Sequence, residues 1–221
     1  MEKYSLHERI LEQKDWAIIL FLVVFALIAI VKTNFENRFN DFIRLLVSDK
    51  YAKIYRDGSL IMSWFTVILF FVQLFSISFF IQLALHAHKI VDKTDFIVYI
   101  QIFVFVMIFI LSKFLVEKII ATTFDEEDLV EQYNMLKINY RTYISMLLLP
   151  VNIYLFYSDL NHLALINCII IIISIAILIT YSKSIKVYQN FIISNLIYFI
   201  LYLCTLEIAP YYFVYYWFAK S

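Results

Sequence analysis

Residues 163–181 read LALINCIIIIISIAILITY, a run without a charge, a glycine or a proline. Bilayer hydrocarbon offers no water to backbone amides, so an apolar run of this length must form a helix or part of a closed barrel. Barrel strands would show short segments of alternating polarity, whereas this run and residues 68–85 are almost continuously hydrophobic. The pattern predicts an all-α protein that crosses a membrane several times.

The composition of the whole chain agrees with this class. Of 221 residues, 63% are hydrophobic, against roughly 45–50% in soluble domains. Lys plus Arg and Asp plus Glu balance at 18 each, so no global charge indicates nucleic acid as a partner. Cys168 and Cys204 both lie in apolar runs without metal-ligand spacing, and we interpret them as small core residues.

Six segments are predicted to span the membrane within one helical domain covering residues 1–221, since about 20 helical residues cross roughly 30 Å of hydrocarbon. The fourth is short and contains Pro150 and Asn152, so a re-entrant segment is the alternative there. The sixth is too long for a straight crossing and is expected to break at Pro210. No small-residue cleavage site follows the first, which we therefore expect to be a retained anchor. The six segments comprise residues 16–31, 60–85, 96–116, 143–157, 163–181 and 191–218.

Two polar connections have helical periodicity of their own. In residues 35–47, aromatic and aliphatic side chains recur on one face while charged residues occupy the other. In residues 124–141, Thr123 and Glu126 have the spacing of a capping box, and an apolar face follows. Both segments are predicted to be amphipathic helices outside the spanning core, lying on the membrane surface or against the spans.

The distribution of basic residues predicts an orientation. Twelve of the eighteen Lys and Arg residues fall on the side of the connections after the first, third and fifth spans, and six fall on the other side. Because cytoplasmic loops carry an excess of Lys and Arg, both termini are predicted to face away from the cytoplasm.

Two runs carry a resemblance to a known family. Residues 44–55, RLLVSDKYAKIY, and residues 202–210, YLCTLEIAP, resemble an uncharacterised family of multi-pass inner-membrane proteins from Bacteroidota. The similarity covers nearly the whole chain. It implies a helical fold in the bacterial inner membrane and, because the family is a domain of unknown function, no catalytic residues.

Glu207 is the first candidate functional residue, because carboxylates within apolar spans usually face a bundle interior. Pro210 denies a hydrogen bond to the carbonyl of Leu206 beside it. Three interpretations stay open: Glu207 rests at the interface below an aromatic belt, forms a structural ion pair, or carries a transported ion.

Other candidates are weaker. His86 and His88 diverge by about 200° on a helix and cannot bind one ion together, although a metal site that includes His162 is geometrically conceivable. His86 continues a polar stripe with Ser78, Gln82 and Lys89, which is expected to line a helix contact. Lys113 and Glu117, four residues apart, are expected to form a surface pair. Asp49, Lys50 and Tyr51 offer a headgroup or partner contact, with helix capping as the simpler interpretation.

The motifs of enzymes are missing from this sequence. A single glycine nearly excludes a phosphate-cradling loop, and no zinc, nucleophile-elbow or paired-acid motif occurs. No cofactor is indicated. The sequence therefore favours a non-enzymatic subunit or scaffold of an envelope assembly, which would contact lipid and another membrane protein or further copies of itself. The alternatives are a small proton- or ion-coupled transporter that uses Glu207, and a membrane enzyme acting on a lipid.

Overall fold

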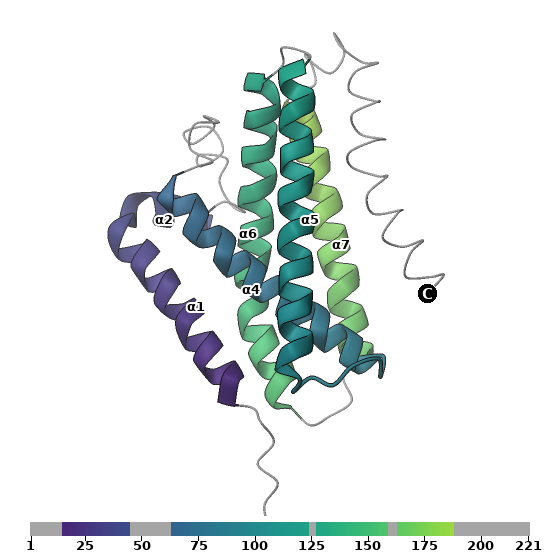
Figure 1. The fold of residues 1–221 in the computed structure, drawn as a ribbon. Coiled ribbons are helices and arrows are strands. Elements are labelled where there is room, and N and C mark those ends of the chain that lie inside the picture. The colour runs from purple at the N-terminus through teal and green to yellow at the C-terminus, as the bar shows by residue number, and fades with distance from the viewer. Residues whose placement is uncertain (1–14, 45–62, 124–126, 159–162, 188–221) are drawn as a thin grey trace, which may run out of the picture.

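The computed structural model describes residues 15–44, 63–123, 127–158 and 163–187. Within these ranges it contains helices and no strand, which confirms the predicted all-α class. The helices pack side by side as a bundle (Figure 1). They are α1 (Asp15–Asn34), α2 (Glu36–Ile43), α4 (Trp64–Ala87), α5 (Phe96–Thr123), α6 (Glu127–Tyr157) and α7 (Leu163–Val187).

Helix α4 is central, because it contacts α1, α5, α6 and α7. Helices α5 and α6 pack against each other as a hairpin that rises beyond the level of α2 (Figure 1). Helix α2 does not lie alone on a surface. Its buried Phe39 and Phe42 pack with Phe65 of α4 and Tyr140 of α6, so the short amphipathic helix lies against the bundle.

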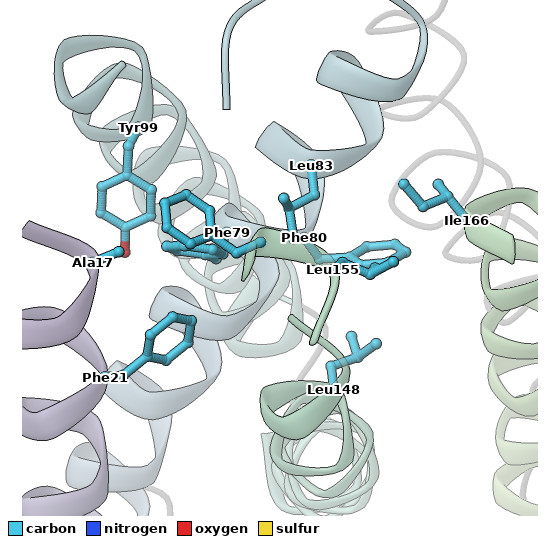
Figure 2. Packing of buried hydrophobic residues seen from close by; sticks show 10 residues of the cluster. Ala17, Phe21, Phe79, Phe80, Leu83, Tyr99, Leu148, Leu155 and Ile166 are labelled. Atoms are coloured by element: carbon cyan, nitrogen blue, oxygen red, sulfur yellow. The ribbon is translucent and has the colours of Figure 1, made fainter. Parts of the chain in front are cut away.

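The main apolar cluster lies where α1, α4, α5 and α6 meet, around Phe79. The Phe79 ring lies 4.8 Å from that of Phe21 and 5.2 Å from that of Phe156, measured between centroids. Figure 2 shows the Tyr99 hydroxyl directed from α5 toward Ala17 of α1. Tilted aromatic contacts of this kind add about 0.5–1.5 kcal/mol each beyond area burial.

One sequence prediction is wrong in its connectivity. Residues 124–141 and 143–157 were expected to be separate elements, but residues 127–157 form one continuous helix, α6. The reason is local, since no glycine or proline separates residue 140 from residue 143. The helix also continues through Pro150 to Tyr157, so this segment does not turn back as a re-entrant element would.

Three helices, α1, α4 and α5, are long and apolar enough to cross a membrane. The surface of the described bundle is also unusually apolar for a water-soluble protein. Helices α1, α5 and α7 expose mainly Ile, Leu, Val and Phe, whereas Gln, Ser, Thr and Asn side chains are buried between α4 and α6. The predicted sixth span, residues 191–218, lies outside the described residues.

Candidate functional site

A row of buried polar side chains follows the α4–α6 interface, and we call it the polar seam. The seam is defined by Gln73, Ser76, Thr142, Ser145 and Asn152, each of which is at most 2% exposed. At one end of it, Thr142 donates to the Oε1 of Gln73 at 2.9 Å. In an apolar bundle such interhelical hydrogen bonds act as specific contacts, because a polar group without a partner would face hydrocarbon.

Ser76 is the centre of the seam and contacts both sides of Pro150. Its hydroxyl donates to the backbone carbonyl of Ser145 at 2.6 Å. Asn152 donates from Nδ2 to the Ser76 carbonyl at 2.9 Å and lies 3.4 Å from the Ser76 hydroxyl. Since Pro150 has no N–H and weakens the hydrogen-bond ladder of α6 around it, Ser76 holds the two flanking turns of α6 together from the neighbouring helix.

A charged cluster lies between α5 and α6. It is nearer to the start of α6 than the polar seam is. Lys137 donates to Glu117 Oε1 at 3.3 Å, and the Lys113 Nζ lies 4.0 Å from the same oxygen. All three side chains are at most 7% exposed. We call these three residues the ion cluster. Two ammonium groups beside one carboxylate are expensive to desolvate, so the cluster is a feature that the fold must specify closely.

The expectation of a surface pair at Lys113 and Glu117 is therefore wrong. Because α6 begins at Glu127 and runs back along α5, its Lys137 covers the pair. Another ion pair of this hairpin, between Lys118 and Glu131 at 3.5 Å, is more exposed. The sequence carried a signal for the cluster, since Asn134 and Lys137 are polar residues on the face of α6 that also bears Ser145 and Asn152.

The opposite end of the bundle is fastened by the α4–α5 connection. Gln82 donates from Nε2 to the carbonyls of Asp92 and Asp95, at 3.2 and 2.8 Å. The indole of Trp16 donates to the Thr94 carbonyl at 3.0 Å, which ties α1 to the same loop. The Asp95 carboxylate accepts from the amide of Ile97 at 2.9 Å and so caps α5.

His86 belongs to this connection. It is half-buried, and its Nδ1 lies 3.1 Å from the Val91 carbonyl. The predicted polar stripe is thus a helix contact at Ser78 and Gln82, which are buried, and reaches the surface at Lys89. Among the described residues, no group of three or more His, Cys, Asp or Glu side chains could hold a metal ion.

A third polar contact fixes α2 to the start of α4. The buried Arg38 guanidinium donates to the hydroxyls of Ser63 and Thr66, at 2.8 and 3.2 Å. It also lies 4.3 Å above the centroid of the Phe65 ring. Arginine suits this position because its planar group can donate to two oxygens and stack on a ring at once. The sequence periodicity of this segment placed Arg38 on the polar face and did not indicate its burial.

Several predicted candidates lie outside the described residues: Glu207, Pro210, His162, Asp49, Lys50 and Tyr51. Cys204 lies there too. Cys168 was expected to be a core residue, and this is wrong, because its side chain is exposed on α7. The surface around it is mainly isoleucine and leucine, so an apolar thiol is compatible with that face.

The described residues define a helical bundle with an apolar surface and polar interhelical contacts. The chain belongs to the family described as Domain of unknown function (DUF4271), whose model matches residues 17–218. This confirms the expected membership of an uncharacterised family. Neither a curated protein nor a solved structure matches the chain.

Proposed function

We propose that this protein is a non-enzymatic, multi-pass subunit or scaffold of an envelope assembly, and that the α5–α6 hairpin is its docking element. Its membrane is the bacterial inner membrane, as the resemblance to proteins of Bacteroidota suggests. Six spans, with both termini away from the cytoplasm, complete the proposed topology. The apolar outer surface of the bundle supports membrane insertion, because apolar side chains face outward and buried hydrogen-bonding groups face one another.

The observation that carries the docking role is the length and bracing of the hairpin. At 1.5 Å per residue, α5 and α6 are about 42 and 46 Å long, whereas the hydrocarbon is roughly 30 Å thick. One end of the hairpin would therefore extend beyond the bilayer, on the side that the basic residues mark as cytoplasmic. The ion cluster joins α5 to α6 near that end, so the projecting part would be held as one body.

Purification of the tagged full-length chain from gently solubilised membranes tests this proposal. We expect a partner to co-purify in stoichiometric amount. It should be lost on Glu127→Lys, which reverses an exposed charge at the start of α6. The matched control is Lys89→Glu, which reverses an exposed charge at the opposite end of the bundle. A chain that purifies without a partner, or a partner lost equally in both variants, would contradict the docking role.

A second candidate, proton- or ion-coupled transport, is favoured by one observation. Glu117 is a buried carboxylate next to an apolar span, and such groups often mark ion pathways. Glu207, for which this role was first suggested, offers a second acid. Reconstituted protein whose proton or cation flux disappears in Glu117→Gln or Glu207→Gln would replace the scaffold by a transporter. Absence of flux in the parent protein would exclude the transporter.

A further inference from the structure

Helix α5 exposes a seam of residues that recur at alternating intervals of four and three. Its apolar members are between 40% and 69% exposed, and they run along the outer face of the helix for most of its length. An alternating four–three spacing is the repeat by which two helices pack in a left-handed pair. We call this set the α5 seam: Ile97, Gln101, Val104, Ile108, Leu111, Leu115 and Lys118.

Gln101 is the polar member of the seam within the apolar part of α5. It follows the helix start at Phe96 by five residues, and its side chain is exposed. Within the part of the chain that the structure describes, its amide makes no hydrogen bond. A primary amide has two donor hydrogens and an acceptor oxygen, and surrounding lipid tails can satisfy none of them. A neighbouring helix that offers a hydrogen bond would therefore be favoured at this position.

We propose that the α5 seam is the contact between two copies of this chain, with Gln101 of each copy hydrogen-bonded to its counterpart. Two copies inserted in the same direction are parallel, so a twofold axis along the membrane normal brings identical residues of the seam together. An amide is complementary to itself, because it both donates and accepts. A single polar residue in such a seam also fixes the register of the two helices.

The charged end of the seam is compatible with this arrangement. Lys118 would approach its counterpart across the twofold axis, which alone would be repulsive. In each copy, however, the Lys118 Nζ lies 3.5 Å from the Glu131 carboxylate, on the side of the hairpin formed by α6. The inference rests on the proposed membrane insertion of α5 and does not depend on the docking role of the hairpin tip.

Cysteine cross-linking of the full-length chain in its native membranes tests the seam. In a background with Cys168→Ala and Cys204→Ala, Val104→Cys and Leu111→Cys are expected to give a covalent dimer on mild oxidation. The matched control is Leu22→Cys on α1, which is 63% exposed and lies outside the seam. Equal cross-linking at all three positions, or none at Val104 and Leu111, would overturn the proposal.

Gln101 is tested by its own variants in the Leu111→Cys background. Gln101→Leu is expected to lower the association constant of the dimer by about threefold to thirtyfold, the range typical of one interhelical hydrogen bond. Gln101→Asn should retain most of the affinity of the parent chain. A dimer unchanged by Gln101→Leu would overturn the assigned contact. Resistance of the protein to alkaline extraction reports on insertion separately. Release of the protein by alkaline extraction would contradict the proposed function. Insertion without cross-linking would contradict only the dimer.

Discussion

Asn152 of α6 donates to the backbone carbonyl of Ser76 on α4, and Ser76 in turn donates to the carbonyl of Ser145 on the other side of Pro150. One residue of the central helix thus contacts α6 before and after its proline. The arrangement explains how α6 continues as a helix through a residue that ordinarily ends or kinks one. The restraint comes from the neighbouring helix, and it depends on a hydroxyl group.

We predict that Ser76→Ala destabilises the protein by about 1 kcal/mol, because it removes the bond to Ser145 and a contact with Asn152. Ser78→Ala is the matched control. Ser78 is equally buried on the same helix, but its hydroxyl has no hydrogen-bond partner in the described part of the chain. The control should be neutral or slightly stabilising.

Equilibrium unfolding of both variants in one detergent measures the difference. If the two alanine variants lose the same stability, the cost comes from packing and the seam hydrogen bonds contribute little. Amide hydrogen exchange adds a local readout, since Ser76→Ala should raise exchange near Pro150 more than in α5.

A second prediction concerns the attachment of α2. Arg38→Lys should loosen α2 from α4, because an ammonium group cannot donate to Ser63 and Thr66 in the same fork and stack on Phe65. Hydrogen exchange is expected to rise in residues 36–43 and to stay unchanged in α6. Arg44→Lys, at the exposed end of the same helix, is the control. Unaltered exchange of α2 in Arg38→Lys would mean that the contacts of the guanidinium with Ser63, Thr66 and Phe65 do not hold α2 in place.

The sequence predicted the helical class and the position of most helices, because long apolar runs can form little else. It predicted only some of the polar residues that are buried. Lys113 and Glu117 have the spacing of an ordinary surface pair, and their burial depends on where α6 packs, which is a tertiary property. The stripe through Ser78 and Gln82 was found in advance because it interrupts an apolar run, where a polar side chain must have a structural reason.

The third prediction concerns orientation. From the excess of basic residues, we predict that the α5–α6 connection faces the cytoplasm and that the α4–α5 connection faces away from it. A membrane-impermeant thiol reagent applied to intact cells should therefore label Lys89→Cys and leave Thr123→Cys unlabelled until the membrane is opened. Both positions are exposed, and the native cysteines are replaced beforehand. The reverse pattern would invert the proposed topology and place the hairpin tip on the outer side.

The last prediction concerns the ion cluster. Glu117→Gln removes the negative charge between two buried ammonium groups, and Lys137→Met removes the closer of the two. Removing one partner of a buried ion pair costs about 3–5 kcal/mol when it leaves the other charge uncompensated. We therefore expect Glu117→Gln to be clearly less stable than Lys137→Met, because Lys137→Met leaves Glu117 beside Lys113, whereas Glu117→Gln removes the carboxylate that both ammonium groups share.

A comparison with a more exposed ion pair shows whether burial causes the high cost of breaking the ion cluster. Lys118 and Glu131 lie at a similar distance, 3.5 Å, but their side chains are 54% and 32% exposed. A double-mutant cycle of Lys118→Met and Glu131→Gln should give a coupling free energy of about 0.2–1 kcal/mol, which weakens as salt is added. The coupling of Glu117 with Lys137 should be larger and insensitive to salt. Equal couplings would mean that water reaches the cluster, and the hairpin would then lack the internal bracing on which its docking role depends.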